Sequence, residues 1–344
     1  MPSPLQTTET GRRIYLLPVS AMFILLISIF ALGIKAGDPV MSWRELHDIL
    51  FTGTGEEIER IIIREIRVPR FTLGLIIGAL LGAAGTLMQG AMNNRLAGPE
   101  LLGVSAGASL GMAAITVLNL PVAFYLHPII ALCGGLLGGM FVILSARGSR
   151  GAAGMLLIGM SVTAILNGLL ILLIALGTSN DVNLLYTYLL GSLANRNWEH
   201  VIRILPWAVV TLPVVILFAR AINLLQLGDE TASGLGLKVE RTRLLILIVC
   251  AVLVAVTVAQ CGPIGYISLM SPHVTRLMLR TLNASYILPV SALCGAVMLT
   301  AADTAARLML YPLEIPVGVW TTLVGGICFL CFFLRNKGGK NNHA

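Results

Sequence analysis

The chain has 344 residues, of which 57% are hydrophobic and only 11% are charged. A soluble domain cannot bury so large an apolar fraction, so the composition excludes a soluble protein and favours a membrane protein. The net charge of +7 is modest and is spread between apolar segments, which indicates membrane topology rather than a nucleic-acid partner.

Apolar segments of about 20 residues, the length that a helix needs to cross the hydrocarbon core, recur along the whole chain. Because lipid offers the backbone no hydrogen-bonding partners, we expect these segments to be helices. The ten predicted spans are residues 15–35, 71–92, 101–119, 126–146, 153–177, 201–219, 243–262, 264–281, 286–309 and 316–334. The sequence therefore predicts an all-α polytopic membrane protein with a single ten-span domain over residues 15–335.

An even number of spans places both termini on the same side of the membrane. If that side is the cytoplasm, the inner segments hold 14 basic and 5 acidic residues, and the outer segments hold 9 basic and 11 acidic residues. Cytoplasmic loops carry an excess of Lys and Arg, so we predict cytoplasmic tails at residues 1–14 and 336–344. The same topology makes residues 36–70 extracytoplasmic and residues 220–243 a cytoplasmic loop.

The outer segment 36–70 ends in RIIIREIRVPRF (60–71), which puts several arginines on the side that the positive-inside rule disfavours. Residues 42–66 show helical periodicity, so we expect one amphipathic helix there. The acidic neighbours of Arg60 and Arg64 favour a solvated helix face for these two arginines.

Small residues recur at three- or four-residue intervals in the spans, as in GLIIGALLGAAG (74–85) and GGLLGG (134–139). Such residues let helix backbones approach closely in lipid, which predicts tight packing and is compatible with a pathway that opens and closes. Asp303 and Arg307 are four residues apart on one predicted helix, so we expect an ion pair between them. The spans lack the buried acidic or histidine relay of many proton-coupled carriers, which argues moderately against a secondary transporter.

The loop RAINLLQLGDETASGLGLKVERTR (220–243) reads as a short amphipathic helix followed by glycines. Its pattern allows either a helix that lies on the lipid interface or a docking surface for a cytoplasmic partner. The acids Asp229 and Glu230 favour docking, because the inner leaflet is itself anionic.

Catalytic and cofactor signatures are absent from the sequence. The segment SGLGLK (233–238) lacks the spacing of a phosphate-binding loop, and the five histidines are scattered. Cys328 and Cys331 have redox spacing but lie inside the last span without a second ligand pair, which favours packing. We therefore predict no catalytic residue, no metal site and no bound cofactor.

Four blocks, in order along the chain, resemble the FecCD-type permeases, the membrane subunits of bacterial ABC importers for iron-siderophores, haem and cobalamin. They are IRVPRFTLGLIIGALLGAAGTLMQGAMNNRLAGPELLGVSAGASLG (66–111), LGDETASGLGL (227–237), GPIGYISLMSPHVTRLM (262–278) and ADTAARLMLYPLEIPVGVWTTLVGG (302–326). The resemblance extends from about residue 60 to residue 335. It implies the type II ABC importer architecture, with ten spans and an internal repeat that relates spans 2–5 to spans 7–10.

The resemblance also implies partners: a second permease subunit, identical or paralogous, two cytoplasmic ABC ATPase subunits and an extracytoplasmic substrate-binding protein. Membrane lipid surrounds the assembly, and no nucleic acid is involved. ATP hydrolysis would belong to the ATPases, so this chain itself would not be an enzyme.

Three groups of site residues follow from the resemblance, position by position. Binding-protein docking is expected at Arg67, Arg70 and Arg307, because a guanidinium matches a carboxylate in bidentate geometry. ATPase coupling is expected at Gly228, Asp229, Glu230, Ala232, Gly234, Leu235 and Gly236. A translocation gate is expected at Asn94, Leu96, Ala152 and Ala153.

The gate region departs from the family pattern. Arg95 stands where the family has a proline, and Gly151 to Ala153 stand where hydroxyl residues often occur. The departure at residues 151–153 suggests closure by small-residue packing.

The sequence thus predicts the permease subunit of an ATP-driven importer in a bacterial plasma membrane. It would carry an iron(III)-siderophore complex by alternating access. The alternatives are a cobalamin or haem permease of the same family and a secondary transporter that works alone. The outer arginines and the inner docking loop disfavour a purely structural membrane protein.

Overall fold

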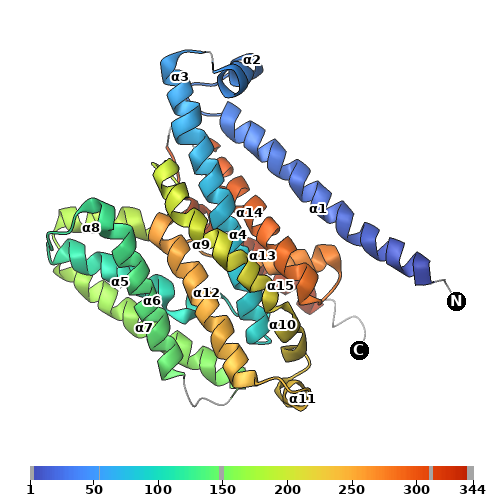
Figure 1. Cartoon of the computed structure of the whole chain (residues 1–344). Coiled ribbons are helices and arrows are strands. Elements are labelled where there is room, and N and C mark those ends of the chain that lie inside the picture. The colour runs from blue at the N-terminus through green and yellow to red at the C-terminus, as the bar shows by residue number, and fades with distance from the viewer. Residues whose placement is uncertain (1–3, 54, 147–150, 310–312, 339–344) are drawn as a thin grey trace.

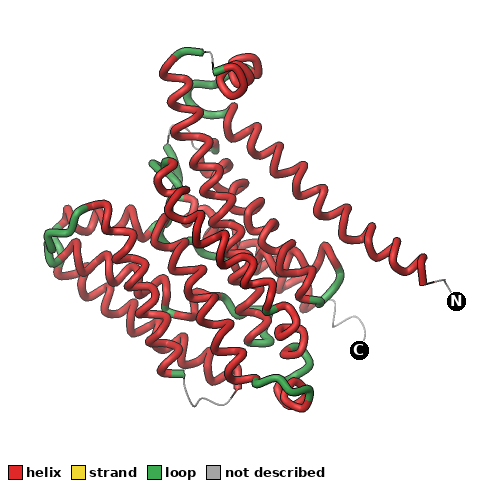
Figure 2. The backbone as a smooth tube through the Cα atoms, in the orientation of Figure 1, coloured by secondary structure: helices red, strands yellow, loops and turns green. Residues whose placement is uncertain are grey.

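The computed structural model describes residues 4–53, 55–146, 151–309 and 313–338 of the chain. Parts of both predicted tails, residues 1–3 and 339–344, lie outside this range, as do Arg147 and Arg150, which entered the charge count. The described residues are mainly helical and contain no strand, as Figure 2 shows. The predicted all-α class is confirmed.

The α-helices are α1 (Pro4–Lys35), α2 (Trp43–His47), α3 (Glu57–Ile61), α4 (Val68–Ala91), α5 (Val104–Val117), α6 (His127–Ser145), α7 (Gly151–Leu176), α8 (Ser179–Leu189), α9 (Trp198–Leu217), α10 (Ala219–Leu225), α11 (Asp229–Gly234), α12 (Val239–Cys261), α13 (Ile267–Leu279), α14 (Ala284–Leu308) and α15 (Val317–Gly338). Two π-helical turns, η1 (Asp48–Thr52) and η2 (Ile62–Arg67), and two 3-10 turns, η3 (Pro99–Leu102) and η4 (Phe124–Leu126), complete the described elements.

Each of the ten predicted spans coincides with one helix, and seven helices of the described chain are long and apolar enough to cross a membrane. Two predicted spans, 101–119 and 264–281, are too long, because α5 has 14 residues and α13 has 13. At 1.5 Å per residue these helices extend only about 20 Å, less than the hydrocarbon core. Left-handed backbone at Gly103 (φ 68°) and Tyr266 (φ 65°) begins each helix late.

The prediction of one continuous amphipathic helix over residues 42–66 is wrong. The segment is divided at Gly53 and Gly55, whose φ angles of 75° and 132° no continuing helix adopts. After this break α3, η2 and α4 form one nearly continuous rod (Figure 1). The first helix also differs from the prediction, since α1 begins at Pro4 rather than at residue 15.

Helix α4 lies at the centre of the bundle, between α14 and α13 on one side and α12 on the other (Figure 1). Its glycines permit this: a Cβ on Gly78 would lie 2.4 Å from the carbonyl oxygen of Gly295, and one on Gly82 would lie 2.2 Å from that of Ser291. The backbones of α4 and α14 are therefore in direct contact, and the predicted packing role of the small residues is confirmed.

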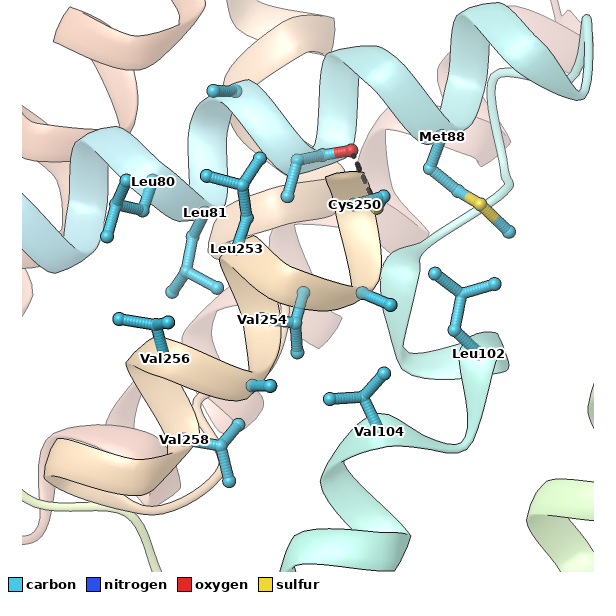
Figure 3. Packing of buried hydrophobic residues seen from close by; sticks show 14 of the residues in the cluster. Leu80, Leu81, Met88, Leu102, Val104, Cys250, Leu253, Val254, Val256 and Val258 are labelled. Carbon is cyan, nitrogen blue, oxygen red and sulfur yellow. Dashed lines mark hydrogen bonds between the residues drawn. The ribbon is translucent and has the colours of Figure 1, made fainter. Parts of the chain in front are cut away.

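The contact between α4 and α12 is filled by branched aliphatic side chains (Figure 3). Leu80 and Leu81 on α4 belong to the same buried cluster as Leu253 and Val254 on α12. The thiol of Cys250 donates to the carbonyl oxygen of Ala84 at 3.4 Å, so this buried cysteine serves packing.

A second close contact joins α6 to α12. A Cβ on Gly135 would lie 3.3 Å from Ala255, and one on Gly139 would lie 3.2 Å from Ala251, so the two helices run antiparallel. Helix α12 thus packs on α6 as α4 packs on α14. In the repeat that the family resemblance implies, α4 corresponds to α12 and α6 corresponds to α14, and these two contacts agree with that correspondence.

Candidate functional site

The residues singled out from the sequence gather at two opposite ends of the bundle. We name them the α3 end and the α11 end, after the helices that lie there in Figure 1. The arginines that were predicted to dock the binding protein lie at the α3 end. The residues that were predicted to couple to the ATPase lie at the α11 end, where α4 also ends.

The arginine cluster at the α3 end consists of Arg67, Arg70 and Arg307. All three line one small pocket between α1, α4 and α14. The structure therefore brings together three residues that are up to 240 positions apart in the sequence.

Arg70 is the centre of an ion-pair network. Its Nε and Nη2 donate to the two carboxylate oxygens of Asp303, both at 2.9 Å, and its Nη1 donates to Glu314, also at 2.9 Å. The predicted ion pair between Asp303 and Arg307 is therefore wrong, because Arg70 already engages both oxygens of Asp303. Bidentate geometry makes this a strong contact.

Arg67 and Arg307 instead hold the C-terminal end of α1. Arg67 donates to the carbonyl oxygens of Ile34 and Pro39, and Arg307 donates to that of Gly33. Carbonyls in the last turn of a helix have no partner within the helix, and cations there also interact favourably with the helix dipole.

The structure does not expose these arginines as the outward-facing socket that the sequence suggested. Arg67 is only 4% exposed and Arg70 only 7%; Arg67 donates to backbone carbonyls of the same chain and Arg70 to carboxylates of the same chain. Arg307 is half-buried. Their role in docking stays a prediction. Arg60 and Arg64 were expected on a solvated face, and they donate to the carbonyl oxygens of Gly53 and Ile49, respectively.

At the α11 end, the coupling segment (residues 227–237) protrudes from the bundle (Figure 1). Gly228, with φ 96°, turns the chain from α10 into α11. Ala232 is fully buried against the main core, whereas Glu230 and Leu235 are exposed. A Cβ on Gly228, Gly234 or Gly236 would meet nothing within 4 Å, so this side of the segment is open.

Sequence reasoning missed one residue at this end. Arg243 had been assigned only to the inner basic charge, but the residue is only 2% exposed, and its guanidinium binds both carboxylate oxygens of Asp229 and the carbonyl oxygen of Ala91. Its sequence context does not distinguish it from the exposed Arg241 two residues earlier.

The predicted gate residues occupy the same end. Asn94 follows α4, and its Oδ1 accepts a hydrogen bond from the backbone N–H of Leu96 at 2.9 Å, while the Leu96 side chain is exposed. Helix α6 runs antiparallel to α12, so α6 ends beside the start of α12. Helix α7 follows α6 in the chain and therefore begins at this end as well. Ala152 packs against the main core, and Ala153 is exposed.

Within the described part of the chain, no group of three or more His, Cys, Asp or Glu side chains could hold a metal ion. The six cysteines are free thiols.

Known proteins resemble this chain over nearly its whole length. The model of the FecCD transport family matches residues 24–335. The Fe(3+)-citrate import system permease protein YfmD of Bacillus subtilis is 37% identical, over 92% of this chain and 95% of its own length. The hemin transport system permease protein HmuU of Yersinia pestis is 35% identical, over 91% and 94%.

A solved structure supports the same relationship. It is described as a metal-chelate type ABC transporter in an inward-facing conformation, and it superposes with a TM-score of 0.82 at 25% identity. The superposition covers 92% of this chain and 98% of the other. The fold, the family model and the relatives agree, and this chain is a multi-pass membrane protein that belongs to the FecCD transport family.

Proposed function

We propose that the chain is the permease subunit of an ATP-driven importer and carries an iron(III) chelate by alternating access. The observation that carries this proposal is the coupling segment. It presents Leu227 and Leu235, which are 57% and 60% exposed, beside the exposed Glu230, while Ala232 anchors the segment in the core. An anchored and partly apolar protrusion is suited to a groove on a cytoplasmic partner.

The substrate proposal rests on the relatives. Permeases named for iron(III) citrate and for hemin are 37% and 35% identical to this chain, respectively, so an iron complex is the favoured cargo. We favour an iron(III) chelate of the siderophore or citrate type over haem or cobalamin.

The proposed assembly contains a second permease subunit, two cytoplasmic ABC ATPases and an extracytoplasmic binding protein. In this assembly the α11 end and both termini face the cytoplasm, and the α3 end faces the binding protein. We propose the arginine cluster as part of that docking end. Because Arg67 and Arg70 are already paired, an incoming carboxylate would have to displace one of their internal acceptors.

The gate is proposed at the α11 end, where the loop with Asn94 and Leu96 follows α4 and where Ala152 and Ala153 begin α7. Closure there would rest on the small side chains of α7 and the exposed Leu96. Movement of α4 would displace this loop directly, because the loop is its continuation.

Reconstitution tests the function. The complete transporter in proteoliposomes is expected to take up a radiolabelled iron(III) chelate, bound to its binding protein, only when ATP is present on the ATPase side. The permease alone is the control. Gradient-driven uptake by the permease without ATPases would contradict the proposal and support a secondary transporter.

Charge reversal in the coupling segment tests the ATPase contact. Glu230→Arg is expected to leave the permease folded, since this side chain is exposed. It should lower substrate-stimulated ATP hydrolysis by about tenfold, in the range of typical couplings between distant sites. Stimulation measured at the wild-type level would count against the assigned contact, and Glu240→Arg on α12 is the exposed control.

A further inference from the structure

Arg243 is a buried arginine in a place where it could have reached water. It lies one turn into α12 at the α11 end, and an arginine near a membrane surface ordinarily extends its guanidinium to the interface. Here the side chain turns inward and is only 2% exposed. A buried cation of this kind must be fully paired, and its partners are therefore informative.

The first partner is the coupling segment. Nη2 and Nη1 of Arg243 donate to the two carboxylate oxygens of Asp229, at 2.8 and 3.2 Å. Asp229 is the first residue of α11, immediately after the turn at Gly228. The bidentate contact fixes both the position and the orientation of the start of α11.

The second partner is the end of α4. Of the last four carbonyl oxygens of this helix, three accept from the following backbone: Met88 from Met92, Gln89 from Asn94 and Gly90 from Asn93, at 3.0, 3.1 and 3.3 Å. The fourth, that of Ala91, accepts from Nε of Arg243 at 2.8 Å. One guanidinium thus completes the C-terminus of α4 and holds the coupling helix.

The same end of α4 also holds the gate loop and α13. The backbone N–H of Asn94 is bonded to Gln89, so the loop begins from the residues that Arg243 caps. The buried Gln89 side chain donates to the carbonyl oxygen of Leu269 on α13 and accepts from Arg276. A displacement of α4 at this point would therefore reach both the loop and α13.

We propose that Arg243 is a positioning residue that transmits movement of the coupling segment to α4 and the gate loop. This inference rests on the proposed function, because it requires an ATPase that moves α11. The contact is short and rigid: a planar guanidinium joins a side-chain carboxylate to a backbone carbonyl with no flexible group between them.

A second contact offers an alternative route by which movement could reach α4. Ile222 on α10 lies against Gly90, where an added Cβ would be 2.5 Å from its side chain. This apolar packing could push α4 but has no means to pull it. Transmission in both directions requires the polar bridge.

The test uses the complete transporter in proteoliposomes and measures iron(III) chelate uptake and ATP hydrolysis in the same vesicles. Arg243→Lys keeps the charge but cannot reach Asp229 in bidentate fashion and Ala91 together. Asp229→Asn removes the ion pair from the more exposed side. In vesicles that contain the assembled complex, each variant is expected to lower uptake per ATP hydrolysed about tenfold.

The double variant, Arg243→Lys with Asp229→Asn, is expected to be no worse than the poorer single variant, because the two residues act as one unit. Arg241→Lys, exposed and two residues away on the same helix, is the control and should retain the wild-type ratio.

The outcomes separate the two proposals. Wild-type uptake per ATP in Asp229→Asn would overturn the inference even if Arg243→Lys does not fold, and additive losses in the double variant would do the same. If the wild-type complex shows no ATP-driven uptake at all, the proposed function fails first and the inference fails with it.

Discussion

Replacing Arg70 with glutamate is expected to remove most of the folded protein from the membrane. The substitution would place three carboxylates together where Arg70 now binds Asp303 and Glu314. The Asp303 carboxylate is buried, so it would lose its counter-ion without gaining water. Loss of one partner from a buried pair costs about 3–5 kcal/mol, and the added repulsion increases that cost.

The measurement is the thermal midpoint and yield of detergent-solubilised permease by size-exclusion chromatography. Arg203→Gln is the matched control, since its ion pair with Glu199 is partly exposed and should contribute only about 0–1 kcal/mol. A charge swap, Arg70→Glu with Asp303→Arg, should recover part of the lost yield. A wild-type midpoint for Arg70→Glu would contradict the structural role.

This expectation changes how a docking experiment at the α3 end must be interpreted. Loss of uptake in an Arg70 variant does not by itself identify a contact with the binding protein, because the same residue holds α4 to α14. To attribute such a loss to docking, the amount of folded permease must be measured in the same variant. Arg307 is the more informative position, because it is half-buried and donates to a backbone carbonyl, that of Gly33.

The sequence predicted the helices well because hydrophobic length is a local property. All ten spans correspond to helices, and the short helix α11 was predicted because its acids and glycines are adjacent in the chain. The errors in length at α5 and α13 arise from left-handed residues, one of them Tyr266, which no composition rule would place there.

The partners of the buried arginines could not be predicted in the same way. Asp303 is four residues from Arg307 and 233 residues from Arg70, so the helical spacing rule favoured the wrong pair. The positive-inside rule counts Arg241 and Arg243 equally, although Arg241 is exposed and Arg243 turns into the protein. Tertiary packing decides these contacts, and a single sequence without the fold does not contain it.

Gly85→Ala is expected to have the second large effect, on both stability and transport. A Cβ on Gly85 would lie 1.6 Å from the carbonyl oxygen of Ser268 and 2.6 Å from its carbonyl carbon. Both atoms are backbone, so no side chain can rotate away and α4 must separate from α13. Overpacking of this kind costs about 1–3 kcal/mol, and rigid backbone on both sides places this case at the upper end.

The separation would also reach the α11 end of the bundle. Gln89 lies one turn beyond Gly85 on α4, and its hydrogen bond to Leu269 on α13 is 3.1 Å long. An added methyl group between the helices would stretch or break this bond. Uptake should therefore fall by more than the loss of folded protein explains, because the end of α4 would no longer hold α13 in register.

Gly168→Ala is the matched control for this substitution. Gly168 lies within α7, and an added Cβ there would meet nothing within 4 Å. Alanine in a helix interior is favoured over glycine by up to about 1 kcal/mol, so this variant should be as stable as the wild type or slightly more stable. Equal thermal midpoints for Gly85→Ala and Gly168→Ala would show that α4 and α13 can separate freely, and the close backbone contact would then have no part in holding the bundle together.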